Sequence, residues 1–170
     1  NKYDKAFARE NTPFPNSFFN DSYEVYNADW TPALLEEFEK RRGYKLENYL
    51  RELLAKGKTD ISCRVVSDYR ETLGEMLLTD FTGQWTSWAH SHGATTRNQA
   101  HGSPANIIDL YAAVDIPECE IFGITDFDIP GLRKDEMRKI NDGDPVTLKM
   151  ASSAAHITGK KFTSSETFTW

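Results

Sequence analysis

The stretch RNQAHGSPANIIDLYAAVDIPECE, residues 97–120, decides the fold that this sequence predicts. It opens with polar side chains that follow a predicted strand, turns at Gly102, Ser103 and Pro104, and continues into a short helix that Asn106 or Ser103 caps. It ends with three acidic residues among the six at 115–120. A strand, a Gly/Pro turn and a helix in this order are how α/β enzymes place chemistry at the carboxyl ends of their strands. The alternative is an ordinary strand–loop–helix unit with a solvated acidic loop.

Outward from this stretch, the spacing of apolar residues predicts helices over residues 32–42, 46–55, 60–89 and 146–156. Strands are expected over residues 17–26, 94–101 and 162–170, and a further short strand over 119–123. Residues 1–16, which contain two prolines, are expected to be irregular. Strands and helices that alternate in this way favour an α/β fold with a parallel sheet and crossover helices. Three or four strands are too few to close a barrel, which needs about eight.

The composition is that of a folded domain, because 39% of the 170 residues are hydrophobic and 27% are charged. The length suggests a single domain over residues 1–170. The net charge of -6 and the lack of a Lys/Arg stripe argue against a nucleic-acid partner. No window approaches the roughly 20 apolar residues of a membrane span, and no secretory signal is visible. Cys63 and Cys119 make neither a disulfide framework nor a zinc motif.

Three carboxylates, Glu24, Glu118 and Glu166, each lie at or just after the end of a predicted strand. All strands of a parallel sheet point the same way, so these side chains are expected to converge on one face. Paired carboxylates across a cleft are what glycoside hydrolysis requires, one to protonate the leaving oxygen and the other to activate water or attack the sugar. The alternative is chance placement, since the chain carries 26 acidic residues.

Two metal sites are also conceivable from the residue types. His90, His92 and His101 are candidate zinc ligands of a zinc-dependent hydrolase, although histidines in such positions are more often solvated or capping residues. Asp115, Glu118 and Glu120 form an oxygen-rich group suited to a hard cation such as calcium, but without the spacing of an EF-hand. No serine-hydrolase elbow and no glycine-rich phosphate loop is present, which argues against a serine hydrolase and a nucleotide cofactor.

Four blocks of the sequence resemble the catalytic core of glycoside hydrolase family 106, the α-L-rhamnosidases. They are SYEVYNADWTP, EFEKRRGYKLENYL, RNQAHGSPANIIDLYAAVDIPECE and ASSAAHITGKKFTSSETFTW, and they follow one another over nearly the whole chain. The resemblance implies part of a (β/α)₈ TIM barrel, from an enzyme that inverts configuration with calcium assisting sugar binding. It also implies a secreted or periplasmic protein of bacteria. Members of the family are several times longer, so the chain is expected to be one fragment of the catalytic domain.

The resemblance also implies roles for individual residues. Glu24 and Glu166 are the first candidates for the acid and base, and Glu118 lies near the calcium site or is itself one of the pair. Calcium ligands would come from Glu118, Asp115 and Glu120. The sugar would contact the side chains of Arg97, Gln99, His101, Trp30 and Trp170.

The sequence therefore predicts part of an inverting glycoside hydrolase that releases terminal α-L-rhamnose from plant-type polysaccharides or glycosides. The alternatives are a non-catalytic carbohydrate-binding fragment and a zinc-dependent hydrolase. The fragment alone is expected to be inactive or nearly so. Its open barrel edges are expected to pair with a second copy or to leave apolar surface exposed.

Overall fold

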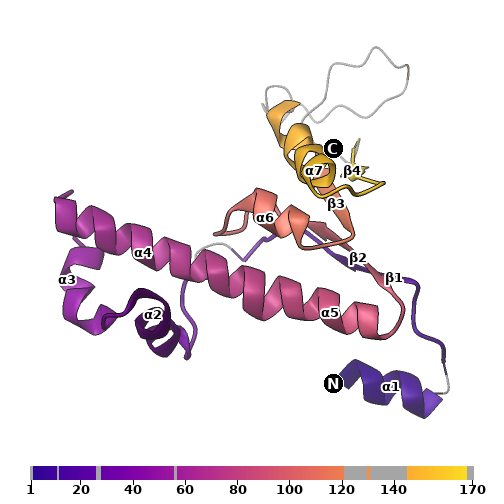
Figure 1. Ribbon diagram of the computed structural model, residues 1–170, viewed down its shortest axis with the longest axis horizontal. Helices are drawn as coiled ribbons and strands as arrows, with labels where there is room; N and C mark the ends of the chain where they lie inside the picture. Colours follow the sequence, from indigo (N-terminus) through magenta and orange to yellow (C-terminus); the bar gives the residue numbers. More distant parts are fainter. Residues whose placement is uncertain are drawn as a thin grey trace.

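A computed structural model describes residues 2–10, 12–25, 28–55, 57–120, 130 and 145–167 of the chain. Its centre is a sheet of four strands, β1 (Ser17–Asn20), β2 (Thr95–Gln99), β3 (Ile116–Glu120) and β4 (Ser164–Glu166). The strands lie side by side in chain order, and each neighbouring pair is parallel (Figure 1). The predicted α/β fold with a parallel sheet is confirmed.

One face of the sheet is covered by three helices, α5 (Gln84–Ser91), α6 (Ile107–Ala112) and α7 (Pro145–Ile157). Side chains alternate between the faces of a strand, so Ala100 and Cys119 point to the same side. There they pack with Leu110 and Tyr111 of α6 and with the small residues Ala151 and Ala154 of α7 in one buried cluster. Small residues on α7 let this helix approach the sheet closely, as the sequence predicts.

The predicted helix over residues 60–89 is one continuous rod, made of α4 (Asp60–Met76), the π-helical turn η2 (Leu77–Gly83) and α5. Its first residue follows a reciprocal cap, in which the Thr59 side chain accepts from the backbone N–H of Ser62 and the Ser62 hydroxyl accepts from Thr59 N–H. Gly74 lets the rod lie close to the loop before α6, because a Cβ there would make a tight contact of 3.2 Å with the Cα of Ala105.

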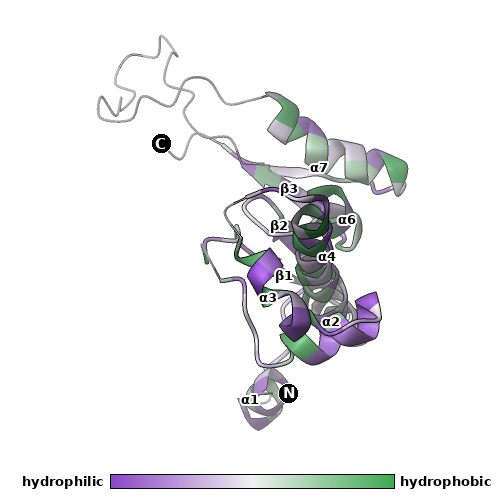
Figure 2. Cartoon of the chain, turned by 90° about the vertical axis from the view of Figure 1, so that its left-hand side faces the viewer, coloured by the Kyte–Doolittle hydropathy of each residue, from purple (hydrophilic) through white to green (hydrophobic). Residues whose placement is uncertain are grey.

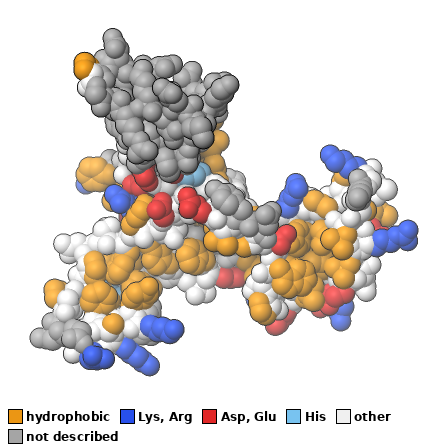
Figure 3. All heavy atoms as spheres, turned by 180° about the vertical axis from the view of Figure 1, so that it is seen from behind, with side chains coloured by type: hydrophobic (Ala, Val, Ile, Leu, Met, Phe, Trp, Pro, Cys, Tyr) orange, Lys and Arg blue, Asp and Glu red, His pale blue; other side chains and the backbone are white. Residues whose placement is uncertain are grey.

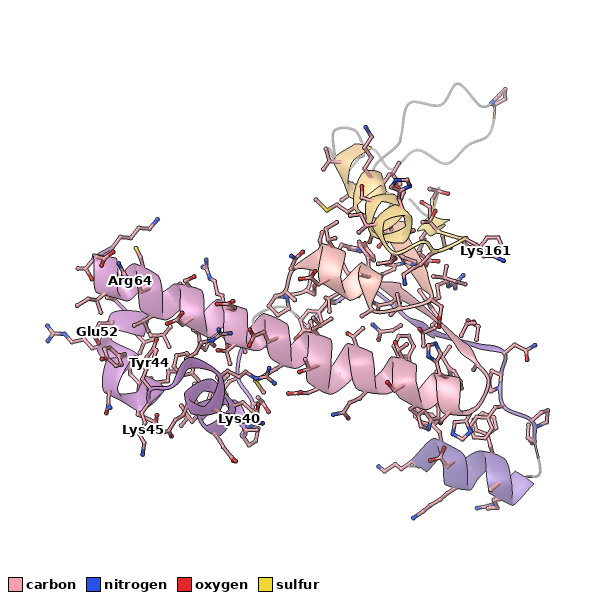
Figure 4. All side chains as sticks on the ribbon, in the orientation of Figure 1. Lys40, Tyr44, Lys45, Glu52, Arg64 and Lys161 are labelled. Atoms are coloured by element: carbon pink, nitrogen blue, oxygen red, sulfur yellow. The ribbon has the colours of Figure 1, made fainter. Side chains whose placement is uncertain are left out.

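The amino-terminal part of this rod, α4, packs with α2 (Leu34–Arg42), the 3₁₀ turn η1 (Leu46–Tyr49) and α3 (Leu50–Leu53). We call α2, η1, α3 and α4, with the turns that join them, the helical arm. The arm extends away from the sheet, with Tyr44, Glu52 and Arg64 on it (Figure 4). It has its own core of Phe38, Leu46 and Val65. Figure 2 shows the contrast with the sheet region, because α2 is largely hydrophilic whereas α6 is hydrophobic.

Two sequence predictions about the ends of the sheet are wrong in detail. Residues 1–16 are not wholly irregular, because α1 (Lys2–Glu10) docks on α5, where Trp88 Nε1 donates to Asp4 Oδ1 at 3.0 Å. The strand expected over 119–123 begins earlier, as β3, and Pro117 and both glutamates lie within it. Proline and clustered acids obscured this strand, because both are depleted in strands. Residues 121–123 lie outside the described part.

Smaller shifts affect the other elements. The first strand ends at Asn20 rather than at residue 26, and Ala33 rather than Thr31 precedes the first residue of α2. The last strand is described over Ser164–Glu166, and residues 168–170 are not described. Within the described residues, no helix is long and apolar enough to cross a membrane.

Candidate active site

Five polar side chains project from the face of the sheet opposite to the three helices. The register pairs Gln99 with Glu118 and Glu120 with Glu166, so alternation along the strands places these four and Arg97 on one side. Viewed from behind the orientation of Figure 1, acidic side chains and a histidine gather near the centre of the molecule (Figure 3). This face is therefore polar, whereas the helix-covered face is largely apolar.

Gln99 lies at the centre of this polar face and joins two carboxylates. Its amide nitrogen Nε2 donates to Glu118 Oε1 at 3.0 Å and to Glu166 Oε2 at 2.8 Å. Gln99 is 2% exposed and Glu118 is 4% exposed, so both polar groups are removed from water. The contacts bring together side chains from three neighbouring strands, β2, β3 and β4. We call Gln99, Glu118 and Glu166 the carboxylate clamp.

Arg97 supplies the positive charge beside the clamp. Its Nε lies 3.2 Å from Glu118 Oε2, and its guanidinium carbon lies 4.4 Å from the centre of the Phe19 ring on β1. Glu118 therefore has a partner at both of its oxygens: Gln99 donates a hydrogen bond to Oε1, and Arg97 forms an ion pair with Oε2. Phe19 is a site residue that the sequence reasoning missed, because its place opposite Arg97 depends on the register of β1 and β2.

A second pair, which joins a half-buried histidine to a buried carboxylate, lies just beyond the carboxyl end of β2. His101 Nε2 lies 3.0 Å from Glu120 Oε2, and Glu120 is 6% exposed. Residue 101 follows the alternation of Arg97 and Gln99, so the pair extends the polar face toward the loops. Buried carboxylates are costly to maintain, and such groups concentrate at functional sites.

Asp115 lies at the opposite end of β3 and has a different set of partners. His90 Nε2 lies 2.9 Å from its Oδ2, and the backbone N–H and the hydroxyl of Thr96 donate to it at 2.7 and 3.0 Å. Burial, the largest single influence, raises the pKa of Asp115, but the hydrogen bonds of His90 and Thr96 together leave it below its ordinary value. This carboxylate ties α5 to β2 and β3.

The metal-ligand sets suggested by the sequence are not assembled in the described part of the chain. The structure separates Asp115 from Glu118 and Glu120, and the three histidines have different partners, since His92 pairs with Asp4 at 2.8 Å. Among the residues that are described, no group of three or more His, Cys, Asp or Glu is arranged to hold a metal ion. The trio proposed for calcium is divided, because Asp115 precedes β3 and contacts His90 and Thr96, whereas Glu118 and Glu120 lie within the strand on the polar face.

Glu24 lies in the loop after β1 and is exposed. The Ser22 hydroxyl donates to its Oε1 at 3.3 Å, and the N–H of Tyr23 donates to the carbonyl of His101 at 3.3 Å. Gly102 has φ +77° and a Cβ there would lie 2.7 Å from the Tyr23 carbonyl, so glycine permits this close approach. The loop thus lies against the carboxyl end of β2, but no described contact joins Glu24 to Glu118 or Glu166.

The two tryptophans expected at the sugar are not part of the described polar face. Trp30 is 55% exposed in the loop before α2, and its neighbour Asp29 accepts a hydrogen bond at its carbonyl from Tyr69 of α4. Trp170 lies outside the described residues. A groove of about 1040 Å³ elsewhere in the molecule runs between α4 and the loop before α6, lined by Gly74 and Pro104 among others, and none of the sheet carboxylates borders it.

Comparison with known proteins places this geometry in context. The sequence model of one family, described as alpha-L-rhamnosidase and numbered glycoside hydrolase 106, matches residues 9–170. A provisionally named beta-glucuronidase of Formosa agariphila is 29% identical over 158 residues, covering 91% of this chain and 12% of that protein. The rhamnosidase from Novosphingobium sp. PP1Y has a similar fold, with a TM-score of 0.66 and 24% identity over 89% of this chain and 14% of its own. The chain thus spans 12–14% of the length of these relatives.

Proposed function

Because the chain belongs to glycoside hydrolase family 106, the alpha-L-rhamnosidases, we propose that it contributes the carboxylates of a glycosidase active site that releases terminal α-L-rhamnose. The family resemblance predicted from the sequence is confirmed by the match over residues 9–170. One observation supports the function most directly: the Gln99 amide holds Glu118 and Glu166 at one place on the polar face. The substrates proposed are plant-type polysaccharides or glycosides.

The spacing of the two carboxylates suits work on a single glycosidic bond. Both contacts end on one nitrogen, so Glu118 Oε1 and Glu166 Oε2 lie no more than about 6 Å apart. Glycosidases use two carboxyl groups on either side of the scissile bond, about 5–5.5 Å apart in retaining enzymes and about 6.5–9.5 Å apart in inverting ones. This separation is shorter than the inverting range, so the inverting reaction that we propose requires Glu118 and Glu166 to move apart around the sugar and its attacking water.

The hydrogen bonds favour different roles for the two groups. Glu118 accepts a hydrogen bond from Gln99 and forms an ion pair with Arg97, surroundings that favour an ionised carboxylate, and we assign it as the base that activates water. Glu166 has one oxygen bound by Gln99, and we assign it as the acid that protonates the leaving oxygen. Glu24, which is exposed and outside these contacts, remains a candidate only if its loop moves.

The arrangement of the sheet supports a (β/α)₈ barrel as the setting of this site. The strands are parallel in chain order, helices cover one face and functional groups project from the other, as in a segment of barrel wall. The secreted or periplasmic location, the self-association at open edges and the calcium ion belong to the same proposal and rest on the family. Calcium would need ligands other than the trio of Asp115, Glu118 and Glu120.

The test measures turnover in the full-length protein with aryl α-L-rhamnosides whose leaving groups differ in acidity. We expect Glu166→Gln to slow poor leaving groups strongly and good ones little, because only poor leaving groups need a proton. Glu118→Gln is expected to slow all of them by roughly 10²–10⁴-fold. The anomer released first, followed by NMR, gives the stereochemistry, and dialysis against a chelator tests calcium.

Two results would contradict the proposal. A well-folded full-length protein that cleaves aryl β-glucuronides but no α-L-rhamnoside would reassign the sugar. Retained turnover in both Gln variants would support the non-catalytic role of this face in carbohydrate binding.

A further inference from the structure

Within the described part of the chain, no group donates a hydrogen bond to the side-chain oxygen of Gln99. Oε1 is buried, and the whole residue is only 2% exposed. A buried amide oxygen without a donor is uncommon in folded proteins, because water is lost and nothing replaces it. Such an atom within a cluster of candidate catalytic groups indicates a place for a donor that arrives with a ligand.

The orientation of the Gln99 amide is fixed by its nitrogen. Nε2 has two hydrogens, and each is directed to a carboxylate, one to Glu118 and one to Glu166. Turning the Gln99 amide group by 180° would place Oε1 against two carboxylate oxygens and would leave both glutamates without this donor. Oε1 is therefore held in one direction by the same contacts that hold the carboxylate clamp together.

We propose that Gln99 determines specificity, with its Oε1 accepting a hydrogen bond from one hydroxyl of the sugar held beside Glu118 and Glu166. This inference rests on the proposed function and identifies one polar contact of that site. A hydroxyl suits the position because it is a neutral donor, whereas the carboxylates that would attract a cation face Nε2 instead. A site that satisfies a buried acceptor only through a substrate hydroxyl discriminates strongly against sugars that lack it.

The experiment uses the full-length protein and four substrates: an aryl α-L-rhamnoside and its 2-, 3- and 4-deoxy analogues. We expect the wild-type kcat/KM to fall about tenfold or more for the one analogue that lacks the partner hydroxyl, beyond its fall for the others. In Gln99→Met, all substrates slow by a common factor because the clamp loses its donors. The extra loss for that one analogue disappears.

Two further variants separate this role from a general effect on the sheet. Gln99→Asn keeps the amide but withdraws its oxygen by one methylene, and it is expected to lose the same preference. Asn98→Leu is the matched control, because Asn98 is a buried amide on the same strand whose alternation places it on the opposite face, where Asn20 donates to it at 2.7 Å. This control is expected to retain the wild-type order of the deoxy substrates.

An equal preference among the four substrates in wild type and Gln99→Met would overturn the inference while leaving the hydrolase proposal intact. If the wild type hydrolyses no rhamnoside, the proposed function fails and calorimetry decides about Gln99. Calorimetry would then compare the affinities of wild type and Gln99→Met for L-rhamnose and its deoxy forms. Equal affinities in the two proteins would overturn the inference about Gln99. Weaker binding by Gln99→Met only of the sugars that carry one particular hydroxyl would support it.

Discussion

The helical arm and the polar face of the sheet both pair opposite charges, but the paired carboxylate on the sheet is the more deeply buried. In the arm, Arg64 and Asp60 form a pair whose side chains are 76% and 79% exposed. On the sheet, Arg97 pairs with Glu118, whose side chain is 5% exposed. Exposed pairs contribute little to stability, whereas a buried carboxylate costs desolvation that a hydrophobic residue would not incur. The comparison teaches that burial, more than the number of ion pairs, distinguishes a candidate active site from a solvated surface.

The two regions also differ in what holds them together. The arm has an apolar core of its own, in which Phe38 and Leu46 are fully buried. The polar face is instead lined by charged and amide side chains. The apolar core of the sheet region lies on the opposite face, under the helices. We therefore expect substitutions in the arm to change stability and substitutions on the polar face to change turnover.

The largest expected effect is the loss of the arm's central aromatic ring. Phe38→Ala should destabilise the arm by about 3–5 kcal/mol, because it removes a fully buried ring and leaves a cavity. Hydrogen exchange of the amides in α2 and α4 should speed up by roughly 10²-fold or more in the full-length protein. The kcat of the folded enzyme should stay near wild type. A fall in kcat without faster exchange would show that the arm takes part in the chemistry.

The next-largest effect is expected on the sheet, where a substitution should lower turnover rather than stability. Arg97→Met removes the cation beside Glu118 while keeping the length of the stem, so turnover should fall by about 10–100-fold. Arg42→Met is the matched control, because Arg42 pairs with Glu71 and Glu75 between α2 and α4 and not with the sheet. Comparable losses of kcat/KM in the two variants would remove the distinction between the regions.

A third prediction compares the two ends of β3. Asp115→Asn should lower stability by about 1–2 kcal/mol at neutral pH, since charge-assisted contacts with His90 and Thr96 are weakened. The pKa of Asp115 is lowered in the folded protein, so its contribution is complete above the ordinary value of 3.8 and is lost as the pH falls below it. The difference between variant and wild type should shrink over that range. Thermal unfolding from pH 7 to pH 3 measures it.

Turnover of the folded Asp115→Asn protein decides whether this residue also serves a metal. The contacts at the amino end of β3 are structural, so we expect kcat to stay within about twofold of wild type. A large loss of activity that added calcium restores would instead place Asp115 in a metal site.

The sequence predicted the helices better than the site because helices depend on local signals. The rod from Asp60 was predicted by apolar spacing, and the end of α2 by Gly43, which has φ +79° at the cap. The parallel sheet followed from the alternation of elements. That Glu118 and Glu166 converge was also predicted, because parallel strands end at one edge.

The parts that could not be predicted depend on contacts between distant segments. Gln99 and Glu166 are separated by 67 positions, and nothing local shows that one amide nitrogen reaches both carboxylates. Asp115 and Glu118 are close in sequence, yet Asp115 lies just before β3 and Glu118 lies in its interior, in different environments. The roles of the site residues remain predictions, which the variants above test.

The smallest expected effect completes the comparison, in the exposed pair of the arm. Arg64→Ala should change the free energy of unfolding by no more than about 0.5 kcal/mol. Its ion pair with Asp60 joins two exposed side chains one helical turn apart. Chemical denaturation at low and high salt measures this, and the small difference should vanish at high salt because mobile ions screen exposed charges. A loss above about 1 kcal/mol that persists in salt would mean that the arm holds its charges as tightly as the sheet does. Burial would then no longer separate the two regions.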